Sequence, residues 1–176
     1  MIELKNINSS IVSRLSKEIF IYPTDTIYGI GCNAEDKKLV GKIRILKGRG
    51  NKPFSIIAPN TEWILKNCQT TESKIKKFLP GQYTLILKKK KKNFLKHVSK
   101  TEFLGVRIPD HPMTKILQKT NKPIITTSVN LSAEKPANKI SEINKTILKK
   151  INLIINAGTL SGKPSKIVKQ EKIIKR

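Results

Sequence analysis

The sequence predicts an α/β fold in which helices cover a sheet. Segments with the apolar spacing of amphipathic helices alternate along the chain with short apolar runs typical of strands. No internal repeat interrupts this alternation, and neither does a long linker rich in Gly, Ser or Pro. The 176 residues suffice for one domain of the usual size, so we expect a single domain over residues 1–176.

In the first half of the chain, helical spacing is clearest between residues 35 and 47. Leu39, Ile43 and Leu46 recur there every three or four residues. The acidic Glu35 and Asp36 favour the positively polarised start of a helix. The other elements expected in this half are a helix at 10–17, strands at 19–22 and 54–58, and one or two helices within 63–79.

In the second half, turn-forming residues separate short apolar strands. Pro80 and Gly81 precede a strand expected at 83–87, and Pro109 ends one expected at 104–108. The remaining expected elements are helices at 111–119 and 140–150 and strands at 123–127, 153–156 and 167–168. Such alternation is typical of a sheet covered by helices.

The composition is strongly basic, with 36 Lys and Arg against 12 Asp and Glu and a formal net charge of +24. A nucleic-acid-binding surface would explain this charge, because Lys and Arg neutralise phosphates. A bias over the whole sequence is the alternative: Lys, Ile and Asn are all frequent and Arg is scarce, as AT-rich coding produces. The Lys run at 88–92 is expected to be an exposed loop, with RNA contact as one use. Because Arg is the better bidentate phosphate ligand, each of the few Arg is a candidate for a specific role.

Several classes of protein are excluded. No apolar run approaches the ~20 residues of a membrane span, and the N-terminus lacks the apolar region of a secretory signal. Cys32 and Cys68 cannot build a disulfide framework, and His97 and His111 are too few for a zinc cluster. We therefore expect a soluble cytoplasmic protein with no membrane partner and no metal held by a set of protein ligands.

Common nucleotide-binding and hydrolase motifs are incomplete. Residues 158–164 resemble a P-loop but have one residue too few between the glycines and a proline where Ser or Thr should bind Mg²⁺. Gly29 and Gly31 lack the third glycine of a dinucleotide fingerprint. We interpret the neighbouring Asp110 and His111 as helix-capping residues rather than part of a hydrolase triad.

Polar, turn-forming residues gather in four segments beside the expected strands, at 22–29, 47–53, 105–112 and 126–132. Ligands of α/β sheets bind where such loops converge. Lys47, Arg49 and Lys52 place three cations on one short loop that also contains two glycines, a combination that suits a polyphosphate.

Three further groups support an anion site. Ser128 and Asn130 alternate on a segment expected to be extended, so their side chains should face the same side, as should those of Thr24 and Thr26. Arg107 stands in an otherwise apolar strand, so it must face solvent or have an anionic partner. A carboxylate ligand would satisfy it bidentately. These residues predict an anion or nucleotide site, with ordinary loop chemistry as the alternative.

The same segments resemble a known family. Residues 22–31 read YPTDTIYGIG, which is similar to the P-T-[ED]-T-x-Y-G-L segment of the YrdC-type threonylcarbamoyl-AMP synthase family. Five more motifs follow in that family's order: KGR at 47–49, PGQYTLIL at 80–87, VRIPDHP at 106–112, SVN at 128–130, and IINAG with PSKIV at 154–158 and 164–168. The resemblance covers nearly the whole chain, from about residue 19 to 176.

The resemblance implies a fold and a reaction. The family's fold is a twisted mixed α/β sheet flanked by helices, with a basic concave groove. The family joins L-threonine, bicarbonate and ATP into threonylcarbamoyl-adenylate and releases pyrophosphate. A downstream threonylcarbamoyl transferase then modifies tRNA. Mg²⁺ bridging the phosphates is expected, with few protein ligands.

The resemblance also implies roles for single residues. The four residues of the K-x-R and S-x-N motifs, taken as catalytic, are Lys47, Arg49, Ser128 and Asn130. The positions that match threonine binding are Thr26, Arg107 and Ser128, and those that match ATP binding are Arg49, Lys52, Asn130 and Arg176. Attack of N-carboxythreonine on the α-phosphate joins two anions, so positioning and charge neutralisation should carry the catalysis. No covalent nucleophile is expected.

This sequence departs from the family pattern at four places. The loop after Arg49 is about one residue shorter, which weakens the equivalence of Lys52. Lys166 and Asn156 replace the usual Thr and Asp. Arg176 is either a nucleotide-contacting residue or part of a frayed basic end. Two alternatives to the synthase remain: a non-catalytic protein of the same fold that binds tRNA or rRNA, and a carbamoyl-transfer domain acting on another acceptor.

Overall fold

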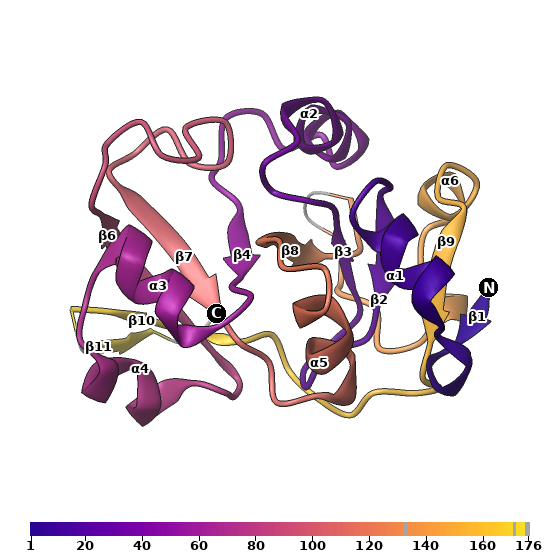
Figure 1. The fold of residues 1–176 in the computed structure, drawn as a ribbon. Coiled ribbons are helices and arrows are strands. Elements are labelled where there is room, and N and C mark those ends of the chain that lie inside the picture. Colours follow the sequence, from indigo (N-terminus) through magenta and orange to yellow (C-terminus); the bar gives the residue numbers. More distant parts are fainter. Residues whose placement is uncertain (132–133, 171, 175–176) are drawn as a thin grey trace.

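The structure is a computed structural model that describes residues 1–131, 134–170 and 172–174 (Figure 1). These residues form one sheet of 11 strands in the order β1-β9-β2-β3-β8-β4-β7-β6-β10-β11, with β5 paired to β6. The strands are β1 (Ile2–Glu3), β2 (Phe20–Tyr22), β3 (Gly29–Gly31), β4 (Ser55–Ile57), β5 (Cys68–Gln69), β6 (Tyr83–Lys89), β7 (Phe103–Arg107), β8 (Ile124–Ser128), β9 (Leu153–Asn156), β10 (Lys166–Lys169) and β11 (Lys172–Ile174).

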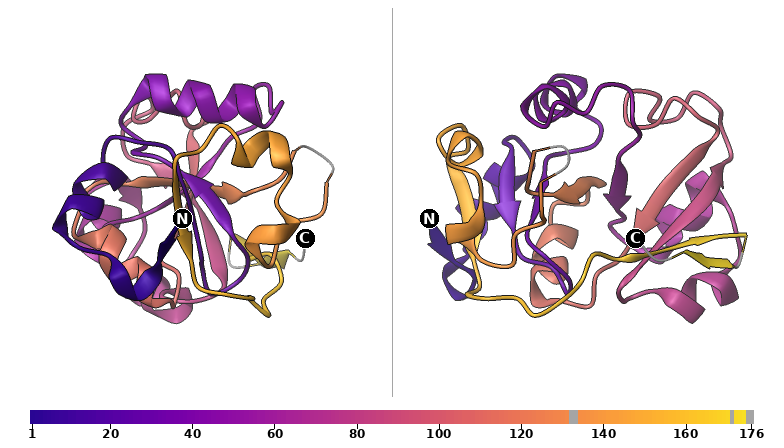
Figure 2. Two further views of the ribbon diagram at one scale, coloured as in Figure 1. Left: turned by 90° about the vertical axis from the view of Figure 1, so that its right-hand side faces the viewer. Right: turned by 180° about the vertical axis from the view of Figure 1, so that it is seen from behind.

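Helices flank this sheet. They are α1 (Ser9–Leu15), α2 (Lys37–Leu46), α3 (Thr61–Asn67), α4 (Glu72–Phe78), α5 (Pro112–Gln118) and α6 (Lys145–Leu148), with 3-10 turns η1 (Leu4–Asn6) and η2 (Ile140–Glu142). Pairing is mixed: β2 lies antiparallel to β3 but parallel to β9, and β4 lies parallel to β7 but antiparallel to β8. The twisted mixed α/β sheet that the family resemblance implied is therefore confirmed (Figure 2).

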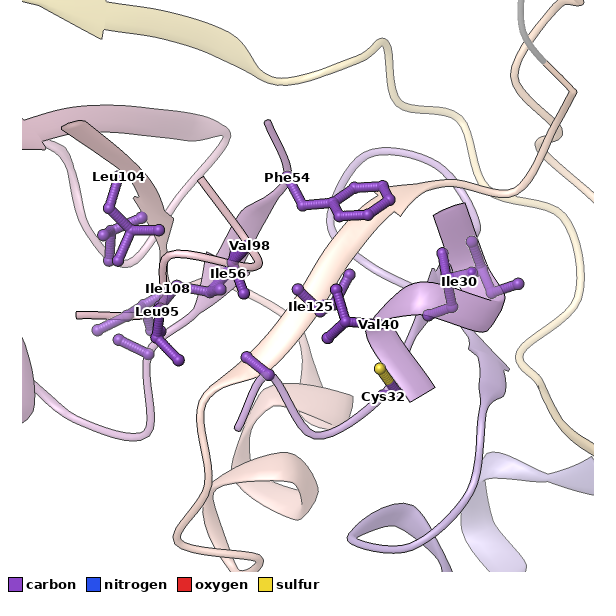
Figure 3. Packing of buried hydrophobic residues seen from close by; sticks show 14 of the residues in the cluster. Ile30, Cys32, Val40, Phe54, Ile56, Leu95, Val98, Leu104, Ile108 and Ile125 are labelled. Carbon is purple, nitrogen blue, oxygen red and sulfur yellow. The ribbon is translucent and has the colours of Figure 1, made fainter. Parts of the chain in front are cut away.

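Alternating strand residues pack into two apolar clusters. Ile56 and Ile125 belong to the larger cluster, whereas their chain neighbours Ile57 and Ile124 belong to the smaller one. Because successive side chains of a strand point to opposite faces, the two clusters lie on the two sides of the sheet at these strands. The larger cluster, part of which Figure 3 shows, receives residues from α2, α3, α4 and α6, and the smaller one from α1 and α5.

Most expected elements are present, with differences at short or glycine-rich segments. The region 63–79 forms two helices, α3 and α4, with the short strand β5 between them. The helix expected at 140–150 is instead η2 followed by α6, because Asn144 caps a new helix by accepting a hydrogen bond from the Thr146 N–H. Strands β1, β3, β5 and β11 were not expected; each has only two or three residues. Such short strands give no alternation to detect.

The Lys run at 88–92 is not the uniformly exposed loop that the sequence predicted. Lys88 and Lys89 extend β6, and Lys89 is buried. The ammonium of Lys89 donates to the carbonyls of Phe94 and Ser99 at 3.1 and 3.0 Å. This lysine therefore holds the following loop in place, whereas Lys88 and the last three residues of the run are exposed.

Residues 157–165 form a strap that joins β9, near one end of the sheet, to β10, near the other (Figures 1 and 2). The strap passes so close to the loop after β2 that a Cβ on Gly162 would lie 2.4 Å from the Cα of Thr26. Asn138 fixes the strap by donating from its side-chain amide to the carbonyls of Leu160 and Gly162. The strap thus forms one wall beside Thr26.

Two glycine substitutions, one in β3 and one in α2, should change the free energy of unfolding in opposite directions. A Cβ at Gly31 in β3 would lie 2.3 Å from the carbonyl oxygen of Ile125, whereas one at Gly41 in α2 would meet nothing within 4 Å. We expect Gly31→Ala to lower the free energy of unfolding by about 1–3 kcal/mol. The control Gly41→Ala should raise it by about 0.5–1 kcal/mol, because alanine favours a helix interior. Urea unfolding measures both; a Gly31→Ala protein as stable as the parent would contradict the pairing of β3 with β8.

Candidate functional site

A cleft of about 270 Å³ lies beneath the strap at the centre of the sheet. Thr26, Arg107 and Ser128, three of the predicted site residues, line it together with Pro164 and Ser165 of the strap. Its other lining residues are Thr24, Ile27, Tyr28, Gly29, Ser55, Thr84, Thr126, Thr127 and Pro136. The walls are therefore rich in hydroxyl groups and contain one cation, a chemistry suited to a small polar anion.

The loop after β2 fixes the hydroxyl of Thr26. The Thr24 hydroxyl lies 2.8 Å from the Ile27 carbonyl and 2.8 Å from the Thr26 hydroxyl. Since a carbonyl can only accept, the single Thr24 proton goes to Ile27, and Thr26 must donate to Thr24. Thr26 is thus left with lone pairs for other partners, one of which is the Nη1 of Arg107 at 3.5 Å. The Thr24 and Thr26 side chains therefore lie on the same side of the chain, as the sequence predicted.

Arg107 has an anionic partner within the protein itself. Its Nη2 donates to Asp25 Oδ1 at 2.6 Å, and both side chains are 6% exposed. The other carboxylate oxygen of Asp25 accepts from the backbone N–H of Asp110 at 3.0 Å. Burial lowers the pKa of Arg107, and the charge of Asp25 opposes this shift. Arg107 Nε is buried with no hydrogen-bond partner among the described residues, which leaves a donor for a further group.

Lys47 is the C-cap of α2 and is buried. Its ammonium donates to the carbonyls of Ser128 and Asn130, each at 2.5 Å. Burial, and then the positive charge of Arg49, lowers the pKa of Lys47 from 10.5 to about 8, while Glu134 opposes the shift. The charge of Lys47 is therefore lost as the pH rises through about 8. The K-x-R loop is joined to the end of β8 through this one cation.

Arg49 lies half-buried in the same loop. Its Nη2 donates to the carbonyl of Pro53 at 2.9 Å, and its Nη1 lies 3.5 Å from the hydroxyl of Thr127. The guanidinium carbon is 5.0 Å from the centre of the Phe54 ring. Arg49 is thus held on the loop at the edge of the cleft, since Thr127 is one of the cleft residues.

Of the remaining predicted site residues, Lys52 and Asn130 do not line the cleft, and Ser128 does not relate to Asn130 as predicted. Strand β8 ends at Ser128, so the alternation predicted for Ser128 and Asn130 does not continue; the two residues meet at Lys47 through their backbone carbonyls instead. Asn130 turns its amide toward the carbonyls of Leu131 and Glu134. Lys52 is exposed on the loop. Arg176 lies outside the described residues.

Other ligand classes find little support in the described parts of the chain. No group of three or more His, Cys, Asp or Glu side chains there is arranged to hold a metal ion. His111 accepts from the Met113 N–H at the start of α5, as the helix-capping interpretation predicted. None of the described helices combines the length and the apolar character that a membrane span requires.

Residues 15–176 match the model of the Sua5/YciO/YrdC family, which is described as "Telomere recombination". The chain belongs to this family. A protein of Methanocaldococcus jannaschii, provisionally named as a threonylcarbamoyl-AMP synthase, is 38% identical over 162 residues, covering 89% of this chain and 76% of its own. The threonylcarbamoyl-AMP synthase of Wigglesworthia glossinidia brevipalpis is 31% identical over 173 residues, covering 94% and 89%.

Solved structures of this family share the fold. Sua5 of P. abyssi, crystallised with L-threonine, superposes with a TM-score of 0.83 at 23% identity over 97% of this chain. This chain spans about half of that Sua5 chain, namely 54%. The E. coli YciO structure superposes with a TM-score of 0.80 at 25% identity and covers 97% of this chain and 89% of its own.

In this Sua5/YciO/YrdC chain, three residues that help to build the cleft were not predicted from the sequence. Asp25 stands between the two threonines of the first motif, and its carboxylate holds Arg107. Thr84 and Ser165 come from distant segments, and their hydroxyls lie 2.8 Å apart in the cleft wall. A signal existed for Asp25, because an anionic partner was one of the two expectations for Arg107. The pairing of β6 with β10, which brings Thr84 and Ser165 together, has no local signal.

The Asp25–Arg107 pair can be tested by stability. Asp25→Asn removes the partner of a buried cation, so we expect it to lower the free energy of unfolding by about 3–5 kcal/mol. Adding Arg107→Met should recover part of this loss, because the unpaired charge is removed as well. The control Asp110→Asn changes an exposed neighbouring carboxylate and should alter stability by about 0.5 kcal/mol at most. If Asp25→Asn and Asp110→Asn lowered the free energy of unfolding by the same amount, this result would contradict the buried pair.

Proposed function

We propose that this protein is a threonylcarbamoyl-AMP synthase, which joins L-threonine, bicarbonate and ATP into threonylcarbamoyl-adenylate and pyrophosphate. The observation that carries the proposal is the convergence of the motifs on one cleft. Thr26, Arg107 and Ser128 line it, and Lys47 and Arg49 contact residues 127–130 at its edge. The relatives named as threonylcarbamoyl-AMP synthases, which align over most of this chain, support the same assignment.

The amino-acid substrate fits the end of the cleft that contains Arg107. A carboxylate there would accept hydrogen bonds from the guanidinium, whose Nε has no other partner among the described residues. Because Asp25 already balances the charge of Arg107, the pair is not a strong trap for anions in general. Thr26 offers lone pairs to a donor such as the substrate nitrogen, since its own proton is committed to Thr24. Ser128 completes the threonine-binding set.

The phosphates of ATP fit the other end, beside Lys47 and Arg49. Joining a carbamate to a phosphate brings two anions together, so these cations would lower the barrier by neutralising charge and fixing the approach. The nitrogen-bound carboxylate of N-carboxythreonine attacks the α-phosphate, the bond to the β-phosphate breaks, and pyrophosphate leaves with its electron pair. No protein nucleophile is required, and Cys32 and Cys68 are both buried with pKa values raised by that burial.

The rest of the assignment follows from the family. Lys52, Asn130 and Arg176 would complete ATP binding, and Lys52 is free to reach outward from its exposed position. Mg²⁺ would enter with ATP, bound mainly by phosphate oxygens and water. A basic concave groove would contact tRNA, and a threonylcarbamoyl transferase would consume the adenylate. A cytoplasmic location suits this chemistry.

A direct test is incubation of the protein with ATP, L-threonine, bicarbonate and Mg²⁺. We expect pyrophosphate release that depends on threonine, and Arg49→Ala should reduce the rate by about 100-fold or more while thermal stability changes little. Arg14→Ala, at a partly exposed arginine paired with Glu18, is the matched control and should keep full activity. A folded protein that binds tRNA but releases no pyrophosphate would support the non-catalytic RNA-binding alternative instead.

A further inference from the structure

Arg44 is one of the few arginines of the chain, and the reaction above gives it no role. It lies in the last turn of α2, three residues before Lys47. Arg14 offers a contrast, because it forms a partly exposed ion pair with Glu18, four residues along the chain. The guanidinium of Arg44 instead binds backbone carbonyls: Nη1 donates to Gly50 and Lys52, each at 2.7 Å, and Nη2 donates to His97 at 3.1 Å.

These bonds hold the loop at 47–53, which contains the K-x-R motif, against the end of α2. Gly48 and Gly50 adopt φ angles of 57° and 55°, which glycine tolerates and which other residues rarely adopt. The Arg49 N–H donates to the Arg44 carbonyl at 3.1 Å, so backbone and side chain of Arg44 hold successive parts of the loop. The bond to His97 ties this arrangement to the segment after β6.

Arg44 and Arg49 also share one aromatic ring. The guanidinium carbons lie 4.6 Å and 5.0 Å from the centre of the Phe54 ring. Phe54 is 1% exposed and lies beside β8, as Figure 3 shows. The position of Arg49 therefore depends on a loop and a ring that Arg44 holds. Lysine cannot replace this arrangement, because one ammonium lacks the planar fork that reaches three carbonyls while stacking on a ring.

We propose that Arg44 is a positioning residue for ATP binding: it sets the shape of the 47–53 loop that presents Arg49 and Lys52 to the triphosphate. The proposal rests on the proposed function, which places the phosphates at this loop. Arg44 itself need not touch ATP, since three of its five N–H groups already donate to the carbonyls of Gly50, Lys52 and His97. Its loss should thus affect ATP and spare threonine, whose cleft is built from other segments.

The test compares Arg44→Ala and Arg44→Lys with the parent and with the Arg14→Ala control. For each protein, KM for ATP, KM for threonine and the Kd of a non-hydrolysable ATP analogue are measured. We expect both Arg44 variants to raise the KM for ATP and the Kd of the analogue by about tenfold or more, because hydrogen bonds from a charged donor are lost. The KM for threonine should stay within about twofold. Guanidinium ion, far below unfolding concentrations, should partly restore ATP binding to Arg44→Ala and have no effect on the parent.

Two results would overturn the proposal. If Arg44→Ala left the KM for ATP and the Kd of the analogue unchanged, the loop would keep its shape without this residue. Equal weakening of ATP and threonine, without rescue by guanidinium, would mean that Arg44 only supports the fold. If the parent releases no pyrophosphate, the proposed function fails; the Kd of the ATP analogue still tests Arg44, so the two failures are distinguishable.

Discussion

The buried ammonium of Lys47 is the interaction on which the site depends most. It joins the end of α2 to the end of β8 by binding the carbonyls of Ser128 and Asn130. These partners are neutral carbonyls whose dipoles solvate the positive charge of Lys47, while Arg49 adds a second positive charge nearby and Glu134 a negative one. Arg107, by contrast, is balanced by Asp25. In our proposal this difference separates a phosphate-binding end, where Lys47 and Arg49 bind carbonyls, from an amino-acid end where Arg107 is paired with a carboxylate.

The fold brings these two ends together through long-range strand pairing. Strand β8 lies between β3 and β4, so it places Ser128 between the loop that contains Thr26 and the loop that contains Arg49. Strand β7 adds Arg107 by pairing with β4 on the other side. The strap then covers Thr26, which explains why Gly162 tolerates no side chain there. The cleft therefore depends on the centre of the sheet and not on any one loop.

Much of this arrangement could be predicted from the sequence, and the limits have physical causes. Apolar runs and capping residues indicated most helices and the longer strands, and the order of six motifs indicated the family. Arg107 in an apolar strand indicated either a solvent-facing position or an anionic partner, but nothing in the sequence allowed a choice between a ligand and Asp25. The contacts of Arg44 with backbone carbonyls could not be predicted, because every residue has a carbonyl and the sequence does not show which ones lie nearby. The alternation predicted at Ser128 and Asn130 was wrong beyond the strand end.

The decisive experiment is an NMR measurement of the side-chain pKa of Lys47 in the free protein and with a non-hydrolysable ATP analogue. We expect a pKa of about 8 in the free protein. The pKa should rise when the analogue binds, because a nearby phosphate stabilises the charged ammonium. A free value near the ordinary 10.5, or a value that the analogue leaves unchanged, would contradict a buried cation at the phosphate-binding end of the cleft.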